Sequence, residues 1–407
     1  MDFDRLAEIR TAYGTPTYVY DKQVMARQYQ NLAQSIRYTP LRIHYACKAN
    51  TNCAILRIFR DLGCAVDCVS PGEIFLALKA GFSSSDILFT GNNLTHSEIM
   101  YAISHDVLMT ADSLSQLEVY GQINPESDVC IRINPNLGAG HHKHVITGGL
   151  QSKFGIYQTD VAQITSLLNK YNLHLKGVHM HIGSGILEPV LLLKGVESLL
   201  QVAGEFPDLE FVDIGGGLGV PYEPGQVSMD LRKFGESLTD MVTRWAEHNH
   251  AVTLVLEPGR FLVAESGILL TTVTAVKENP KYTFVGVDTG FNHFMRPALY
   301  NAYHEIVKVV PSESRREFQE HSEVTVCGDI CESADIFARN RLLPPLKEGD
   351  LLAILNTGAY GFSMASEYNS RPLPAEVLVD KTTVTEIRKR GTFQDLLRNQ
   401  CEVDIDG

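Results

Sequence analysis

The sequence predicts an α/β protein made of a (β/α)8 barrel and a second, β-rich domain. Short apolar, strand-like runs alternate with helix-length spacers up to about residue 260, and strands separated by turns fill the rest. Alternating units of the first kind require parallel strands, which right-handed crossovers wind in one direction. Polar residues follow the ends of the apolar runs, where a barrel of this type carries its active site.

The barrel prediction rests on eight candidate strands. The spacers between them are amphipathic, for example Pro71–Ala80 and Val161–Tyr171, which is typical of helices packed on a sheet. Eight strand–helix units fit a closed barrel, for which about 250 residues are typical, and a doubly wound open sheet is the competing architecture. The runs end near Cys47, Val69, Thr90, Ala111, Asn134, His181, Gly215 and Glu257.

The pattern changes after Gly259, where helix-length spacers give way to turns. The N-terminal segment contains the strand-like run TPTYVYD, and we expect it to join this second domain because chain termini are often close together. The expected domains are therefore 25–265 for the barrel, and 1–24 with 266–407 for a β-sandwich or barrel-like domain. The predicted strands of the second domain are 268–278, 282–289, 323–329, 351–356 and 375–388.

Composition narrows the class of protein. The chain has 407 residues, of which 44% are hydrophobic and 20% charged, so it is globular rather than disordered. Its formal net charge of −13 argues against binding to nucleic acid or to an anionic membrane, because phosphates would repel such a field. We find no secretory signal and no apolar run long enough to span a membrane, and the eight cysteines are expected to be thiols, so a cytoplasmic location is expected.

Two motifs at strand ends indicate binding of a phosphorylated ligand through an imine. Lys48 follows an apolar strand, and desolvation at a barrel mouth would lower its pKa and prepare the amine for imine chemistry; a surface lysine is the alternative. The run Gly215–Gly219 can direct several backbone N–H groups at an anion, or it is a flexible turn. It does not match the dinucleotide motif, because Val220 stands where the third glycine is required.

Glu257 and His181 also end strands. A buried Glu257 needs a cationic partner, which is either Arg260 or a protonated heterocycle; in the second case Arg260 is available for a substrate carboxylate. His181 can stack on a ring, act as an acid or base, or be a core residue, and His179 is interpreted as a core residue. Together with Lys48 and the glycines, these groups are the contacts that pyridoxal phosphate requires.

No metal site is expected. The cluster His141, His142 and His144 lies in the glycine-rich loop between Gly138 and Gly149, without a nearby cysteine or acidic ligand. The same glycines would allow this loop to close over a substrate.

The sequence resembles the alanine-racemase-fold group of pyridoxal-phosphate-dependent decarboxylases, and within it the enzymes that act on diaminopimelate. The resemblance covers essentially the whole chain and consists of many motifs in the same order. They include TPTYVYD, YACKAN, DCVSPGE, SKFGI, HIGSG, GGGLGVPY, EPGR, MRPALYNAYHEI, CGDICESADIF and GAYGFSMASEYNSRP.

The resemblance implies a role for each matching residue. Lys48 would hold the coenzyme covalently, His181 would stack on its ring, and Glu257 would keep the ring nitrogen protonated. Cys331, supplied by the partner subunit of a homodimer, would be the proton donor. The other implied cofactor contacts are Asp67, Ser184, Gly215, Gly216, Gly217, Pro258, Gly259, Arg260 and Tyr360, and the implied substrate contacts are Arg260, Arg296, Tyr300, Glu332 and Tyr360.

The implied reaction is decarboxylation of meso-2,6-diaminopimelate to L-lysine and carbon dioxide, the last step of lysine biosynthesis. A pair of guanidinium groups in a shielded site would bind a dicarboxylate in spite of the negative net charge. A decarboxylase of D-ornithine, D-lysine or carboxynorspermidine is the alternative, and a non-catalytic regulatory homologue is a further one. Departures from the family pattern leave these open, namely Asp329, Glu367, Asn301 and Gly391.

Overall fold

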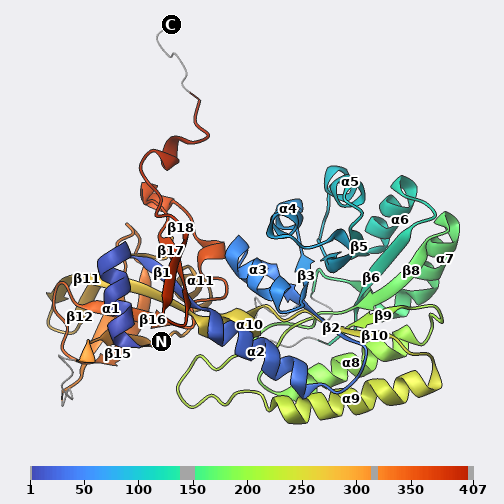
Figure 1. The fold of residues 1–407 in the computed structure, drawn as a ribbon, viewed down its shortest axis with the longest axis horizontal. Coiled ribbons are helices and arrows are strands. Elements are labelled where there is room, and N and C mark those ends of the chain that lie inside the picture. Colours follow the sequence, from blue (N-terminus) through green and yellow to red (C-terminus); the bar gives the residue numbers. More distant parts are fainter. Residues whose placement is uncertain (1, 138–151, 313–319, 402–407) are drawn as a thin grey trace, which may run out of the picture. The chain divides into compact units, whose positions relative to one another are not determined.

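The computed structural model describes residues 2–137, 152–312 and 320–401. The chain divides into two compact units: Met25–Val263, and Met1–Val24 together with Ala264–Gly407 (Figure 1). The first unit is a closed parallel barrel surrounded by helices and the second is built on a mixed sheet, so the predicted fold class is confirmed. The loop between Gly138 and Gly149, which contains His141, His142 and His144, lies outside the described residues.

The barrel consists of parallel strands that close on themselves. Pairing of β10 with β2 completes the ring that runs through the neighbouring strands, and β5 pairs with β6 on the other side. The short strand β7 (Ile156–Tyr157) adds to the end of β6. The strands of the ring are β2 (Leu41–Ala46), β3 (Ala65–Cys68), β4 (Ile87–Phe89), β5 (Leu108–Ala111), β6 (Asp128–Asn134), β8 (His174–His179), β9 (Phe211–Asp213) and β10 (Thr253–Leu256).

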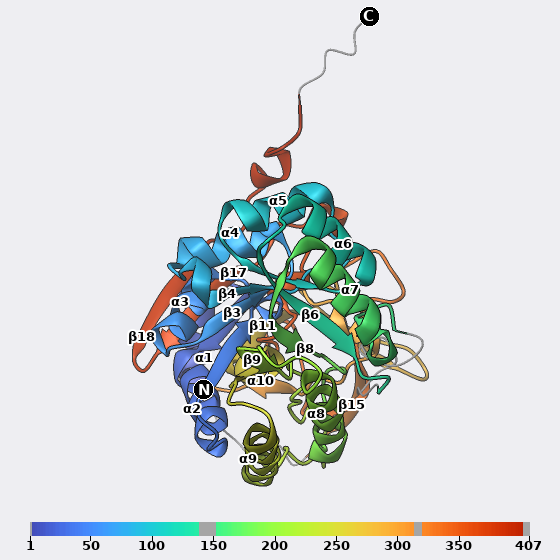
Figure 2. The same ribbon diagram turned by 90° about the vertical axis from the view of Figure 1, so that its right-hand side faces the viewer.

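Helices lie around these strands, as the end-on view in Figure 2 shows. Local capping explains where several of them begin: Ser70 accepts from the backbone N–H of Glu73 at the start of α4, and Thr95 and Glu98 form a capping box at α5. The helices are α2 (Lys22–Ser35), α3 (Cys53–Asp61), α4 (Pro71–Ala80), α5 (His96–Ser104), α6 (Leu114–Ile123), α7 (Val161–Tyr171), α8 (Pro189–Ala203), α9 (Leu231–His248) and α10 (Arg260–Val263), with the 3-10 turn η1 (Cys47–Ala49).

The β-rich unit is organised around its N-terminal strand. Strand β1 (Thr17–Asp21) lies between β11 (Gly267–Glu278), to which it is antiparallel, and β17 (Ala375–Asp380), to which it is parallel. Helix α1 (Phe3–Tyr13) packs Leu6 and Ile9 into the same core. The other elements are β12 (Thr283–Val287), α11 (Arg296–Tyr300), β13 (Ile306–Val309), β14 (Ser322–Cys327), β15 (Ile336–Leu343), β16 (Leu351–Leu355) and β18 (Thr383–Arg388).

The sequence prediction for this unit is incomplete. The run 375–388, predicted as one strand, is a hairpin of β17 and β18 that turns at Lys381, where φ is 56°. Strands β13 and β15 and helices α1 and α11 were not predicted. Cys331 lies in the loop that follows β14.

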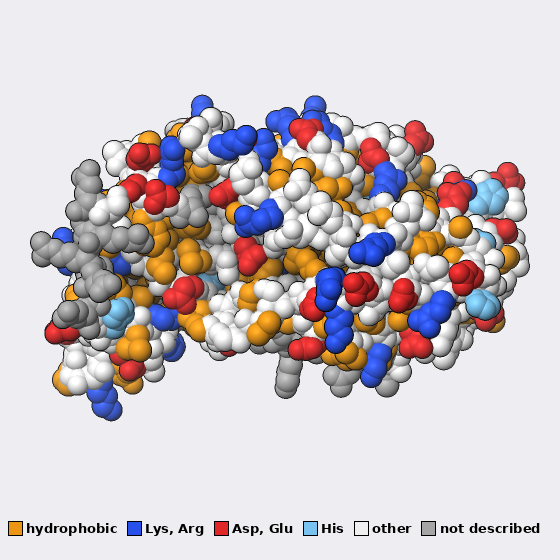
Figure 3. Space-filling view, turned by 60° about the horizontal axis from the view of Figure 1, so that its bottom comes forward, with side chains coloured by type: hydrophobic (Ala, Val, Ile, Leu, Met, Phe, Trp, Pro, Cys, Tyr) orange, Lys and Arg blue, Asp and Glu red, His pale blue; other side chains and the backbone are white. Residues whose placement is uncertain are grey.

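Charged side chains are distributed over the surface. On the face shown in Figure 3, acidic and basic side chains are interspersed and no broad block of one sign is visible. Within the described ranges, no helix is both long and apolar enough to cross a membrane.

Candidate active site

Lys48 lies in η1, directly after β2, and its ammonium group is paired with Asp67 at the end of β3. The side chain of Asp67 is fully buried, whereas that of Lys48 is 34% exposed. Thr90, which follows β4, donates to the second carboxylate oxygen of Asp67. Burial and the negative charge of Glu257 raise the pKa of Asp67, and Lys48 and Thr90 oppose this. Lys48 is thus held by a buried carboxylate, and its side chain remains partly exposed.

The glycines after β9 are packed against backbone and leave no room for side chains. A Cβ on Gly215 would lie 2.1 Å from the carbonyl oxygen of Met180, and one on Gly216 would lie 2.2 Å from that of Glu257. Gly215 and Gly217 also have positive φ values of 68° and 101°. The segment Gly215–Gly219, here called the glycine shelf, is thus packed tightly against backbone at the strand ends.

Glu257 follows β10 and is paired with His179, whose Nε2 lies 3.0 Å from its Oε2. Both side chains are almost completely buried. Burial acts to raise the pKa of Glu257, but His179, Lys48 and His44 outweigh it and hold the pKa well below its ordinary value. The partner of Glu257 found in the structure is His179, which the sequence analysis interpreted as a core residue.

His181 lies on the glycine shelf. The backbone N–H of Gly216 donates to its Nδ1 at 3.2 Å, so a neutral ring carries its proton on Nε2. Burial, followed by the charges of Arg132 and Lys48, lowers the pKa of His181 well below its ordinary value. The ring is therefore neutral near pH 7 and suited to lie flat against an aromatic ligand.

Arg260 begins α10 and is buried. Its Nε and Nη2 donate to Ser184 Oγ, both at 3.1 Å, and its Nη1 donates to the hydroxyl of Tyr222 at 3.1 Å. Pro258 and Gly259, which precede Arg260, pack against the end of β2. The N–H of Ala46 donates to the carbonyl oxygen of Pro258, and a Cβ on Gly259 would lie 2.9 Å from the carbonyl oxygen of Ala46. The predicted residues of the barrel therefore gather at the carboxyl ends of β2, β3, β8, β9 and β10.

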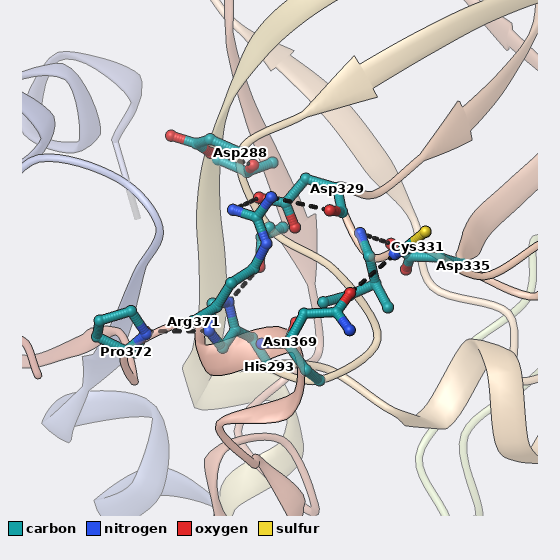
Figure 4. A network of polar contacts seen from close by, with 12 residues as sticks. Asp288, His293, Asp329, Cys331, Asp335, Asn369, Arg371 and Pro372 are labelled. Carbon is teal, nitrogen blue, oxygen red and sulfur yellow. Dashed lines mark hydrogen bonds and ion pairs between the residues drawn. The ribbon is translucent and has the colours of Figure 1, made fainter. Parts of the chain in front are cut away.

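Cys331 and Glu332 share a loop in the β-rich unit (Figure 4). The N–H of Cys331 donates to Asn369 Oδ1 at 2.9 Å, and the hydroxyl of Tyr368 donates to Glu332 at 2.7 Å. Asp335 fixes the same loop by accepting from the N–H of Ile330 at 2.7 Å. The Cys331 thiol is exposed and points away from Arg371 in Figure 4.

Arg371 closes the base of this loop. It pairs with Asp329 at 2.5 Å and donates to the carbonyl oxygen of Asp329 at 2.9 Å. Burial raises the pKa of Asp329 to about 6, although Arg371 acts in the opposite direction. A cavity of about 810 Å³ opens beside it. It is lined by Pro16, His293, Asp329, Cys331, Asn369, Ser370, Arg371, Pro372, Arg390, Gly391, Thr392 and Phe393.

The remaining predicted substrate residues also belong to the β-rich unit. Arg296 and Tyr300 are the first and last residues of α11, and the Nε of the buried Arg296 donates to His304 at 3.2 Å. Tyr360 has a φ of 55°, an uncommon value for a tyrosine, and such strained residues often occur at functional sites.

The barrel residues meet the chemical requirements of pyridoxal phosphate. Oε1 of Glu257 is buried without a hydrogen-bond partner among the described residues, as an acceptor awaiting a ring N–H would be. The glycines of the shelf are required at the strand ends, because a Cβ on Gly215 or Gly216 would meet a backbone carbonyl oxygen. Lys48 supplies an amine and His181 a flat neutral ring.

The model of the pyridoxal-dependent decarboxylase pyridoxal-binding domain matches residues 22–264. The chain belongs to the pyridoxal-dependent decarboxylases. A diaminopimelate decarboxylase of Methanothermobacter thermautotrophicus is 44% identical over 97% of this chain and 93% of its own, and that of Escherichia coli K12 is 39% identical over 97% and 96%. The crystal structure of the Helicobacter pylori diaminopimelate decarboxylase with L-lysine has a TM-score of 0.89 and 35% identity, covering 97% of this chain and 98% of its own.

Membership of this decarboxylase family confirms the resemblance and the pyridoxal coenzyme expected from the sequence. Sequence reasoning missed several residues of the site, namely His179 as a partner, Tyr222, Thr90, Asp335 and Arg371. Thr90 could have been found because it ends a predicted strand next to Asp67. The pairing of His179 with Glu257 could not, since it depends on how far β8 and β10 approach across β9.

Proposed function

We propose that this decarboxylase converts meso-2,6-diaminopimelate to L-lysine and carbon dioxide. Full-length similarity to diaminopimelate decarboxylases supports the substrate. The observation that carries the coenzyme assignment is Glu257, a buried carboxylate at a strand end whose pKa is held low. Pyridoxal phosphate, when bound, supplies the electron sink that decarboxylation of an amino acid needs.

Several residues of the chain would hold the coenzyme, each at a different part of it. Lys48 holds the coenzyme, with Asp67 keeping its amine in place. Glu257 would accept the ring N–H, His181 would cover the ring face, and the segment Gly215–Gly217 together with Ser184 would contact the phosphate. The other cofactor contacts are Pro258, Gly259, Arg260 and Tyr360.

Selectivity for a dicarboxylate comes from arginine. Guanidinium groups bind carboxylates through two parallel hydrogen bonds and stay charged when buried, and Arg260 and Arg296 are both buried. In this proposal they bind the distal carboxylate together with Tyr300, while Glu332 binds the distal ammonium and Tyr360 contacts the substrate. A diamino acid without the second carboxylate leaves a buried charge unpaired and is rejected.

The active sites are shared in a homodimer. The exposed thiol of Cys331 is the proton donor, and it reaches the barrel of the partner subunit together with Glu332. The same proposal places the enzyme in the cytoplasm, in line with its eight unpaired thiols.

Carbon dioxide release from meso-diaminopimelate, L-ornithine, D-ornithine and carboxynorspermidine tests the substrate. Turnover of the first alone is expected, and turnover of another compound alone would replace the substrate but not the coenzyme. The visible absorption band of the bound coenzyme should be absent in Lys48→Ala, and a normal band in that variant would overturn the role of Lys48.

Subunit mixing tests the shared site. Neither Lys48→Ala nor Cys331→Ala homodimers should be active, whereas mixed dimers contain one intact site and should recover up to about a quarter of the activity at equal amounts. Mixed dimers that form, as shown by tagged co-purification, but remain inactive would contradict the shared arrangement.

A further inference from the structure

A buried group of polar side chains lies on the barrel interior around Glu257. His44 comes from β2, His179 from β8 and Asp213 from β9. Their exposed fractions are 7%, 2% and 0%, and that of Glu257 is 5%. One ligand-type atom from each of His44, Asp213 and Glu257 lies within 4.8 Å of the other two. These three side chains therefore interact in a region from which water is largely removed.

Each of the two carboxylates has one satisfied oxygen and one unsatisfied oxygen. Asp213 Oδ1 accepts from the N–H of Gly215 at 2.8 Å, and Glu257 Oε2 is paired with His179. Asp213 Oδ2, Glu257 Oε1 and both ring nitrogens of His44 have no partner within the described residues. The two unsatisfied oxygens belong to neighbouring carboxylates, and two acceptors cannot satisfy each other without a proton.

The surrounding charges do not remove this conflict. His179 is the ion-pair partner of Glu257, while Lys48 is paired with Asp67 and Arg132 with Asp112. Asp213 has no ion-pair partner of its own in the described parts of the chain. Neighbouring carboxylates with little solvent do not both ionise, so one of the pair retains a proton.

We propose that Asp213 is the protonated member of this pair and donates a hydrogen bond to Glu257, which makes it a positioning residue that keeps Glu257 ionised toward the coenzyme ring. Burial, followed by the charge of Glu257, raises the pKa of Asp213 well above its ordinary value, whereas that of Glu257 is lowered. The groups that face Asp213 are Glu257, Asp67 and His44, and its own loop adds the N–H of Gly215. The role toward the coenzyme rests on the proposed function; the proton on Asp213 does not.

A cavity of about 240 Å³ lies next to this group, at the amino ends of the strands. His44 lines it together with Arg42, Glu210, Phe211 and Val255. Burial lowers the pKa of His44 to about 4, so its ring is neutral near pH 7 and has one donor and one acceptor nitrogen. The neutral ring of His44 can therefore donate one hydrogen bond and accept one close to Asp213 and Glu257.

Infrared spectroscopy of the coenzyme-free protein at neutral pH tests the proton directly. We expect a carbonyl band of a protonated carboxylic acid that shifts when aspartate carries ¹³C and that is lost in Asp213→Asn. The matched control is Asp67→Asn, which removes the other fully buried aspartate of the barrel mouth and should keep the band. A band that survives in Asp213→Asn, or no such band in wild-type protein, would overturn the proposal, whatever the substrate proves to be.

Coenzyme binding separates a protonated from an ionised Asp213. Asparagine retains an acceptor for Gly215 and a donor for Glu257, so Asp213→Asn should bind pyridoxal phosphate within about threefold of wild type and keep the same absorption maximum. Asp213→Ala removes the donor and should weaken binding roughly 10-fold to 100-fold. Equal losses of coenzyme affinity in both variants would show that the negative charge of Asp213 matters, and would contradict the proposal. A stoichiometric metal ion that elemental analysis finds in wild type but not in Asp213→Asn would contradict it as well. If Asp213→Ala does not fold, the ¹³C shift in wild type still decides whether an aspartate carries the proton.

Discussion

Nε2 of His179 lies 3.0 Å from Oε2 of Glu257, and the two side chains are only 2% and 4% exposed. The two residues are separated by 78 positions in the chain and come from strands on either side of β9. The pair fixes the orientation of Glu257 and leaves its other oxygen directed elsewhere. His179 therefore determines what Glu257 can bind.

Replacing His179 tests this pairing. His179→Ala leaves a buried carboxylate without its partner, so we expect the free energy of unfolding to fall by about 3–5 kcal/mol. His179→Gln keeps a donor near the position of Nε2 and should recover part of the loss. Urea unfolding of the coenzyme-free protein measures both, and equal stability of wild type and His179→Ala would show that the pair contributes nothing.

A methyl group on Gly216 should disturb the glycine shelf. Its Cβ would lie 2.2 Å from the carbonyl oxygen of Glu257, and its φ is not positive, so the effect is steric. We expect Gly216→Ala to lose about 1–3 kcal/mol of stability, with weaker pyridoxal phosphate binding. Gly204→Ala is the control, because its Cβ would meet nothing closer than 3.4 Å. Similar behaviour of the two variants in thermal unfolding and fluorescence titration would contradict the steric account.

Tyr222 should contribute to binding through Arg260. Tyr222→Phe removes the hydroxyl that accepts from Arg260 Nη1 at 3.1 Å, and a hydrogen bond to a charged group is typically worth about 1.5–3 kcal/mol. We expect KM for the substrate or Kd for the coenzyme to rise roughly 10-fold, with little change in stability. Tyr282→Phe, at a tyrosine that is 50% exposed, should leave both constants unchanged.

Asp329 should make stability depend on pH in a defined direction. Its pKa is about 6 in the folded protein against an ordinary value of 3.8, because burial raises it. A carboxyl group with a raised folded-state pKa binds its proton more tightly when folded, so it adds stability as the pH falls from above 6 toward 4.

Asp329→Asn removes that dependence. Between pH 7 and pH 5, we expect the gain in unfolding free energy to be smaller than in wild type by on the order of 1–2 kcal/mol. Asp395 provides the opposite case, since hydrogen bonds from Thr392 lower its pKa, and Asp395→Asn should not reduce the gain. Identical pH profiles for wild type and Asp329→Asn would refute the expectation.

The barrel could be predicted from sequence because its strands are buried on both faces and therefore form continuous apolar runs. Strand β15 lies at the edge of its sheet and carries Arg339 and Arg341, as edge strands often carry charges. These charges interrupt the apolar pattern, so the strand was not predicted from the sequence. Helix α1 could have been recognised, because Leu6 and Ile9 repeat at helical spacing.

The residues of the site were also only partly predictable from the sequence. Lys48, Glu257 and the glycines were found because catalytic groups follow strand ends. The contact of His44 with the groups behind Glu257 was not predicted, because His44 faces inward within a strand and resembles any other core position. Which inward side chains meet depends on barrel closure, and neither local spacing nor periodicity contains that information.

Strand β1 has a consequence for how the protein is made. It is synthesised before the barrel, yet its neighbour β17 is synthesised only at residues 375–380. The barrel residues 25–263 emerge in between and can fold first, since most of their strand pairs join neighbours in the chain. Until β17 has been synthesised, the edge of β1 that will pair with it is open. A chaperone, or strand β1 of another copy of the chain, could bind at this open edge.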